Sequence, residues 1–104
     1  MTVRKTATFQ VRPEGLDRAK AAIREFVAYV RENEPGTFRY LSLQEQDDPT
    51  RFLHYFEFRD EKAEDIHSSS PAVQRLTSVL YPLCVQPVEF TDLALLATTE
   101  SQPS

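Results

Sequence analysis

The order in which the hydrophobic period changes along the chain is the feature that most restricts its fold. Apolar residues alternate with polar ones over residues 3–12, which is typical of a half-buried strand. Over residues 16–34 the apolar positions instead follow the period of an amphipathic helix. Alternation returns at 37–46 and 51–59, a second helical region follows, and the last alternating segment spans 85–96. The sequence therefore predicts strand-helix-strand-strand-helix-strand.

Local signals mark the boundaries between these elements. Pro35 ends the first helix, because proline disfavours helical backbone in the residue before it. Residues 46–50 favour a turn, so the two central strands are predicted to form a hairpin. Asp60 and Ser70 are expected N-caps of two helical segments, the second with Pro71 at its first position. The second helical region is thus predicted to be interrupted.

The length and the element order together indicate one domain. A chain of 104 residues leaves no room for a second independent core. We predict an α+β fold of ferredoxin-like β-α-β-β-α-β type, with an antiparallel sheet and the helices on one face. Residues 1–96 are expected to form this domain, and residues 97–104 a flexible C-terminal tail.

Charge and composition argue against several classes of partner. The net charge is −4, and acidic and basic residues are interspersed, so no basic patch for nucleic acid is expected. With only two glycines, the chain lacks the glycine-rich loops that bind nucleotide phosphates. No apolar run approaches the roughly 20 residues of a membrane span, and no apolar segment follows the basic N-terminus. We expect a cytoplasmic protein.

The metal-ligating residue types are too sparse to predict a metal centre. Cys84 is the single cysteine, and the two histidines have no nearby acidic or cysteine ligands in a recognised spacing. A lone thiol also cannot form an internal disulfide. The sequence predicts neither a metal nor an organic cofactor.

The segment 51–59 is largely apolar on both of its predicted faces. Its alternating residues are Phe52, His54, Phe56 and Phe58 on one face and Leu53, Tyr55 and Glu57 on the other. The neighbouring strands add Leu41, Leu43, Leu93 and Leu95 to the second face. Helices can cover only one face, and an exposed apolar patch of this size is unusual in a monomer. We expect a homodimer through the sheet face; the alternative is that long side chains and the tail cover it.

Several blocks of residues resemble the antibiotic biosynthesis monooxygenase family. They are Glu34–Tyr40, Asp47–Phe52, Phe58–Ala63 and His67–Ser70, within a similarity that spans residues 3–95. The resemblance implies a dimeric α+β barrel. The family includes quinol monooxygenases, polyketide-tailoring oxygenases and haem-degrading enzymes, so the fold alone does not define an activity.

The chain departs from the family pattern at two positions. Members often carry tryptophan where this chain has Phe58, and the chain has no tryptophan. Many members also carry glutamate where this chain has Phe56, while here the carboxylate is shifted to Glu57 on the opposite face. No role of the replaced side chains is carried over.

A pocket between the sheet and its helices is the expected site of chemistry. His54 is the one ionisable side chain in a row of phenylalanines, so it is either a general base or a core histidine paired by hydrogen bonds. His67 ends the first short helix and is a second candidate base, or packs structurally. The expected substrate-binding residues are Phe9, Tyr40, Phe56, Phe58 and Tyr81.

These residues favour a monooxygenase that needs no metal, flavin or haem. An electron-rich phenolic or quinol-like substrate supplies its own electrons, so the protein removes a proton and excludes water. The alternative is a non-catalytic dimer that binds a small aromatic or hydrophobic ligand. Haem degradation is a third hypothesis, which the absence of tryptophan weakens.

Overall fold

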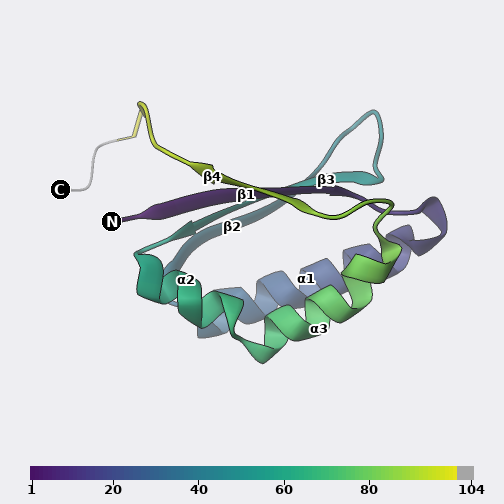
Figure 1. Cartoon of the computed structure of the whole chain (residues 1–104), viewed down its shortest axis with the longest axis horizontal. Helices are drawn as coiled ribbons and strands as arrows, with labels where there is room; N and C mark the ends of the chain where they lie inside the picture. Colours follow the sequence, from purple (N-terminus) through teal and green to yellow (C-terminus); the bar gives the residue numbers. More distant parts are fainter. Residues whose placement is uncertain (101–104) are drawn as a thin grey trace.

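Three helices pack against one face of a four-stranded antiparallel sheet (Figure 1). The structure is a computed structural model that describes residues 1–100. Its elements are β1 (Val3–Gln10), α1 (Leu16–Asn33), β2 (Thr37–Gln44), β3 (Arg51–Phe58), α2 (Glu61–Ser68), α3 (Pro71–Leu80) and β4 (Glu89–Leu93), with short 3₁₀ turns at Pro13–Gly15 and Tyr81–Leu83.

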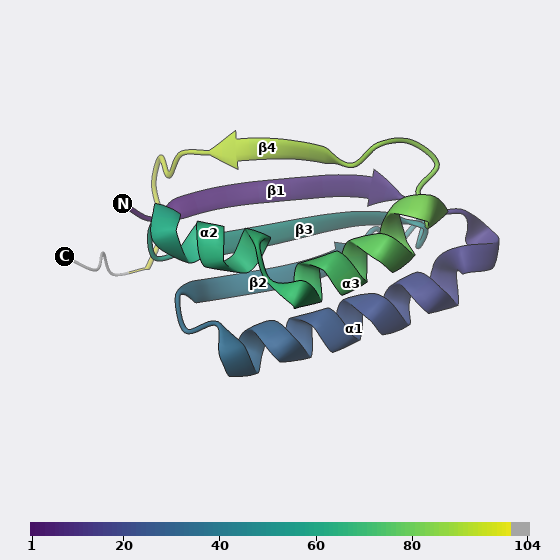
Figure 2. The ribbon, with the colours of Figure 1, turned by 60° about the horizontal axis from the view of Figure 1, so that its bottom comes forward.

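The strand order is β2-β3-β1-β4, and every neighbouring pair is antiparallel. Figure 2 shows all three helices in front of the same face of this sheet. The predicted α+β ferredoxin-like fold is therefore confirmed. Within the described chain, no helix is both long enough and apolar enough to cross a membrane.

The predicted caps divide the second helical region into α2 and α3. The Asp60 carboxylate accepts a hydrogen bond from the Ala63 amide at 2.9 Å and begins α2. The Ser70 hydroxyl accepts from the Val73 amide at 3.2 Å and begins α3, with Pro71 in its first turn. Each cap satisfies an amide that would otherwise lack a partner at the helix start.

The last strand is shorter than predicted. It was expected over residues 85–96, whereas β4 spans Glu89–Leu93. Pro87 lacks the amide hydrogen that pairing in a sheet requires, so β4 begins only after it. Leu93 already pairs with Arg4, so β1 offers almost no residues beyond it. Residues 94–100 form no helix or strand, and the rest of the predicted tail, 101–104, lies outside the described residues.

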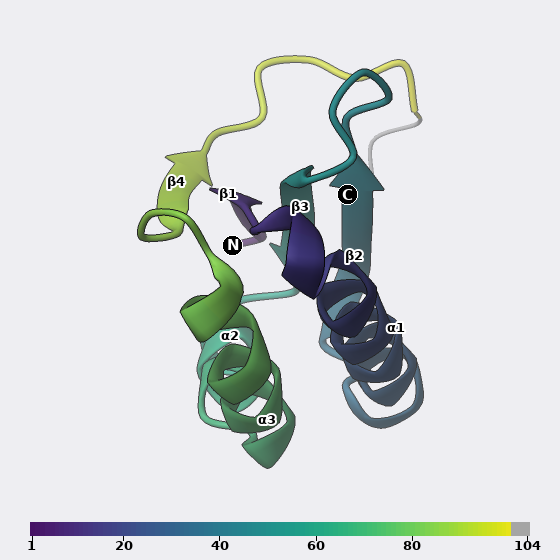
Figure 3. The ribbon, with the colours of Figure 1, turned by 90° about the vertical axis from the view of Figure 1, so that its right-hand side faces the viewer.

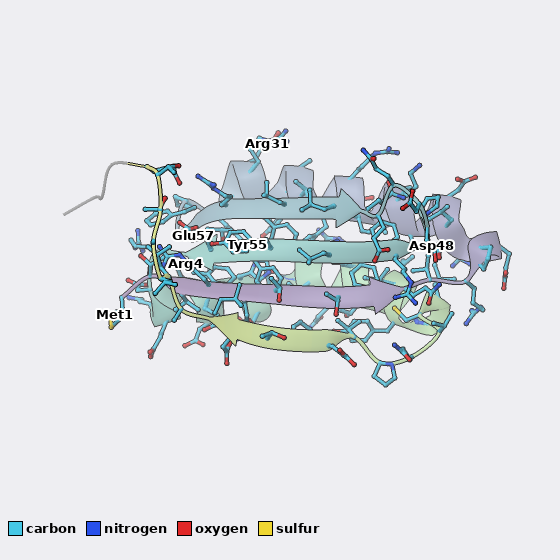
Figure 4. All side chains as sticks on the ribbon, turned by 90° about the horizontal axis from the view of Figure 1, so that it is seen from above. Met1, Arg4, Arg31, Asp48, Tyr55 and Glu57 are labelled. Atoms are coloured by element: carbon cyan, nitrogen blue, oxygen red, sulfur yellow. The ribbon has the colours of Figure 1, made fainter. Side chains whose placement is uncertain are left out.

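The alternation predicted for β3 is confirmed on both faces. Phe52, His54, Phe56 and Phe58 are buried under the helices. The opposite face of the sheet is seen in Figure 4, where Arg4, Tyr55 and Glu57 lie together. Apolar side chains with 38–50 % of their surface exposed lie in the strands: Leu41, Leu43, Leu53 and Leu93.

A β-bulge interrupts the alternation of β2. Thr37 lies opposite Phe58 and Arg39 opposite Glu57, so one extra residue, Phe38, is inserted between them. On an unbroken strand Phe38 would share a face with Tyr40, but it is 55 % exposed while the ring of Tyr40 packs into the core. The bulge is the physical reason for this difference.

Gly36 lies between α1 and β2, where the chain passes close to α2. A Cβ atom at Gly36 would lie 2.7 Å from the Cβ of Ala63, an atom fixed directly to the α2 backbone. A Cβ atom at Gly15 would lie 2.6 Å from a terminal methyl carbon of Leu83, whose side chain can rotate. The two glycines therefore differ in how easily a neighbour can move.

We predict that Gly36→Ala lowers the free energy of unfolding by about 1–3 kcal/mol, the usual cost of overpacking. Gly15→Ala is the matched control and is expected to lose less, because the Leu83 side chain can rotate away. Urea unfolding monitored by circular dichroism measures both. If Gly36→Ala loses no more stability than Gly15→Ala, the Gly36–Ala63 contact relaxes as easily as the Leu83 side chain does.

Candidate functional site

A mostly apolar cavity of about 190 Å³ lies between the sheet and the helices. It brings together all seven side chains selected from the sequence: Phe9, Tyr40, His54, Phe56, Phe58, His67 and Tyr81. The first five come from β1, β2 and β3, whereas His67 comes from the last turn of α2 and Tyr81 follows α3. The sequence pattern therefore located the cavity.

The mouth of the cavity lies beside α2 and β4. Tyr81 and Phe90 line it and are 48 % and 59 % exposed. Lys5 forms ion pairs with Glu64 of α2 and, at 3.4 Å, with Asp92 of β4. The hydrogen bond to Glu64 is the main cause that raises the pKa of Lys5. Because two carboxylates accompany this one cation, the mouth offers no excess positive charge to an anionic ligand.

His67 forms a buried pair with Glu34, which lies 33 residues earlier in the chain. The Nδ1 atom of His67 lies 2.8 Å from Oε1 of Glu34, and both residues are at least 93 % buried. The Thr37 hydroxyl donates a second hydrogen bond to the same Oε1, also at 2.8 Å. α2 presents the imidazole and the end of α1 presents the carboxylate. Glu34 thereby fixes the orientation of the ring.

The second ring nitrogen of His67 remains free. No hydrogen bond of Nε2 is found among residues 1–100, and the one fully buried side-chain polar atom there without a partner is Oε2 of Glu34. Nε2 therefore keeps access to the cavity that His67 lines. The rings of Phe58 and Phe26 pack against the imidazole at centroid distances of 5.0 and 5.4 Å. The geometry is that of an oriented base facing an apolar space.

Glu34 was not selected as a site residue from the sequence, although it belongs to the block that resembles the family. A signal was present. Negative charge at the C-terminal end of a helix is electrostatically unfavourable, and Glu34 is the C-cap of α1. A carboxylate in that position, immediately before Pro35, needs a compensating donor when it is buried.

His54 is held differently, because both of its ring nitrogens are occupied. The Tyr40 hydroxyl lies 2.8 Å from Nδ1, and the Ser42 hydroxyl lies 2.9 Å from Nε2. His54 is only 2 % exposed, and this burial lowers its pKa to about 4. Burial, together with the nearby charge of Glu34, raises the pKa of Tyr40. His54 and Tyr40 are therefore both uncharged at neutral pH.

No metal-binding cluster is found in the part of the chain that the structure describes. Within residues 1–100, no group of three or more His, Cys, Asp or Glu side chains is placed to hold a metal ion. The polar groups of the cavity are instead arranged as a histidine–carboxylate pair and a histidine between two hydroxyls.

The sequence profile of the antibiotic biosynthesis monooxygenase family matches residues 2–77, which include β1, the hairpin and most of both histidine environments. The chain belongs to this family. Membership associates the protein with monooxygenase chemistry at the level of the family. Among curated proteins, none matches the chain at a significant level.

Several solved structures share the fold over nearly the whole chain. A candidate antibiotic biosynthesis monooxygenase from Bacteroides thetaiotaomicron is 19 % identical, with a TM-score of 0.88, and the match covers 98 % of this chain and 96 % of that one. Rv0793 from Mycobacterium tuberculosis is 24 % identical, with a TM-score of 0.85 and coverages of 96 % and 100 %. A further antibiotic biosynthesis monooxygenase is 26 % identical, also at 0.85, with coverages of 93 % and 100 %.

The depressed pKa of His54 predicts a specific loss of stability in mild acid. Below pH 6.5 the unfolded chain protonates His54, whereas the folded chain does so only near pH 4. The unfolded state therefore binds more protons in this window, and stability falls as the pH falls. We expect a loss of about 2 kcal/mol between pH 7 and pH 5 from this residue.

The His54→Gln variant isolates this contribution, because glutamine does not titrate. Urea unfolding of both proteins at several pH values between 7 and 5 should show a shallower slope in the variant, whatever its absolute stability. Parallel slopes would mean that His54 takes up its proton over the same pH range in the folded and unfolded protein, contrary to its burial between two hydroxyls.

Proposed function

We propose that this protein is a monooxygenase that oxidises an electron-rich phenolic or quinol-like molecule without a metal, flavin or haem. The observation that carries the proposal is the free Nε2 of His67, backed by the buried Glu34 and directed at an aromatic cavity. Family membership supports the reaction class, and the cavity supports an aromatic ligand.

His67 acts as the general base in this proposal. The phenolic proton moves to Nε2, which leaves an electron-rich anion beside the aromatic rings of the cavity. Glu34 keeps the other ring proton on Nδ1 and stabilises the imidazolium that forms, which is the usual role of a carboxylate behind a catalytic histidine. Two histidines were candidates from the sequence, and the geometry favours His67, since both nitrogens of His54 are already bonded.

The electrons for the reaction come from the substrate. For a substrate SH2 the balance is SH2 + O2 → SO + H2O, in which one oxygen atom enters the ring system and the other leaves as water. No external reductant is needed. The apolar walls from Phe9, Phe56 and Phe58 exclude water, which protects the reactive anion from side reactions.

The size of the cavity limits the substrate. An apolar cavity of about 150 Å³ is sufficient to bind benzene. The cavity here, at about 190 Å³, accommodates one substituted ring and little more. A monocyclic hydroquinone or catechol is therefore a better first substrate than a fused polycyclic phenol.

The activity test compares His67→Gln with the parent protein. Loss of a positioned base is expected to lower the rate of oxygen consumption with a monocyclic hydroquinone by about 10²-fold or more. Glu34→Gln is expected to lose less, because the amide still accepts a hydrogen bond but stabilises the imidazolium poorly. Ser69→Ala, an exposed change just beyond α2, is the control and should keep full activity.

Two results would contradict this assignment. Full activity of a folded His67→Gln variant would exclude His67 as the base. If the parent protein consumes no oxygen with any of several hydroquinones but binds them in calorimetry, the protein is a small-molecule-binding dimer, the alternative function predicted from the sequence.

The proposal includes a homodimer through the sheet face opposite the helices. Leu41, Leu43 and Leu53 form an apolar strip across β2 and β3 on this face. Beside it, Tyr55 donates a 2.8 Å hydrogen bond to Glu57, and Arg4 pairs with Glu57 at 3.8 Å. A second copy related by a two-fold axis would place the two strips against each other. The cytoplasmic location expected from the sequence likewise stays a prediction.

Leu53→Asp tests the dimer, because it places a charge in the centre of the apolar strip. Light scattering of the parent protein is expected to give about twice the 12.0 kDa mass of one chain, and the variant should give monomer or insoluble protein. Ile66→Asp is the matched control, since Ile66 is equally apolar and 53 % exposed but lies on α2. A monomeric parent protein would rule out the dimer.

A further inference from the structure

Three side chains form a continuous hydrogen-bonded row through the core. The hydroxyl of Tyr40 contacts Nδ1 of His54 at 2.8 Å, and the hydroxyl of Ser42 contacts Nε2 at 2.9 Å. Tyr40 and Ser42 are two residues apart on β2, and both side chains hydrogen-bond His54 of β3. The His67–Glu34 pair shares no hydrogen bond with this row, although the rings of Tyr40 and His67 lie 5.7 Å apart.

The two ends of this row open onto different spaces. Tyr40 and His54 line the aromatic cavity. Ser42 lines a separate groove between α1 and the outer edge of β2, together with the basic residues Lys20, Arg24 and Arg31. The cavity and the groove have no lining residue in common. Figure 3 shows the reason, since α1 lies below β2 while α2 and α3 lie toward β1 and β4.

The groove is in contact with the surface of the molecule. Arg24, Arg31 and Gln44 are exposed, and Ser42 itself is partly exposed. The ring of Tyr40 packs against those of Phe26 and Phe56 at 5.3 and 5.2 Å, and Tyr40, like Ser42, is partly exposed. His54 between them is 2 % exposed. The row therefore joins the mostly apolar cavity to the basic surface groove through a fully buried imidazole.

We propose that Tyr40, His54 and Ser42 form a proton relay between the cavity and the surface groove. A proton passes from the Tyr40 hydroxyl to Nδ1, while Nε2 releases its proton to the Ser42 oxygen and Ser42 releases one to water in the groove. Tyr40 regains a proton from the cavity. One proton has then crossed the core, His54 has changed tautomer, and no group has gained a net charge.

The partners of His54 suit this transfer in both directions. A hydroxyl can donate or accept, so each of the two neutral tautomers of the imidazole is fully hydrogen-bonded by Tyr40 and Ser42. A carboxylate in either place would fix one tautomer, as Glu34 does for His67. The low pKa of His54 is consistent with a group that passes a proton on rather than storing it.

The relay would supply a need of the proposed oxygenation, and to that extent it rests on the proposed function. The reaction removes a proton from the substrate early and requires protons on the oxygen that leaves as water. His67 faces the cavity and is at least 93 % buried, so its contact with solvent runs through the cavity that the substrate would fill. Tyr40 lines the same cavity and is connected to the groove through His54 and Ser42.

The matched variants Ser42→Thr and Ser42→Val test the relay. Threonine and valine have nearly the same shape, both suit a strand, and valine alone lacks the hydroxyl. Ser42→Val is expected to lower the rate of oxygen consumption by about 10²-fold, the low end for a positioned proton-transfer group, and to change its solvent isotope effect. Ser42→Thr should restore most of the rate.

A second measurement does not depend on activity. In ¹⁵N NMR spectra, exchange between tautomers gives both ring nitrogens of His54 intermediate chemical shifts, and Ser42→Val should convert them to those of a single tautomer. Exchange in a parent protein that oxidises no hydroquinone would support the relay while refuting the oxygenation. A single His54 tautomer in the parent, with equal rates in the threonine and valine variants, would overturn the relay.

Discussion

The alternation of β3 is the constraint on which the cavity depends. Because successive side chains of a strand point to opposite faces, the same eight residues build the floor of an aromatic cavity and the apolar strip on the other side of the sheet. A register shift of one residue would exchange Phe56 and Glu57 between these environments. The buried face admits one polar side chain, His54, and its two hydroxyl partners come from the neighbouring strand.

The two histidines show how the partner decides the chemistry of a buried imidazole. His67 has a carboxylate on Nδ1 and no hydrogen-bond partner among residues 1–100 on Nε2, so its ring is oriented while Nε2 stays open to a ligand. His54 has a hydroxyl on both sides, so it is satisfied as a neutral ring. Both imidazoles pack beside the ring of Tyr40. His54 also packs beside Phe9 and His67 beside Phe26, and all four centroid distances are 5.0–5.7 Å. The difference comes from hydrogen bonding rather than from the apolar surroundings.

Periodicity and capping residues were sufficient to predict the element order, the helix starts at Asp60 and Ser70, and the inner face of β3. They could not predict the contacts that distinguish the histidines. Glu34 and His67 are separated by 33 residues, and their pairing depends on how α1 and α2 end relative to each other. The shortened β4 likewise reflects where β1 begins, because Leu93 pairs with Arg4 near the N-terminus. Such features arise from tertiary pairing, which local patterns do not contain.

The bulge in β2 also fixes the length of the segment from Glu34 to Tyr40, which links α1 to β2. Thr37 and Tyr40 are three positions apart, and on a regular strand their side chains would point to opposite faces. The extra residue at Phe38 lets Thr37 bond the buried Glu34 while Tyr40 bonds His54 on the same inner face. Relatives that differ by a single-residue insertion or deletion here could retain one of these bonds but not both. Connections usually tolerate changes in length. In this one, the number of residues between Thr37 and Tyr40 is set by the two hydrogen bonds that they make.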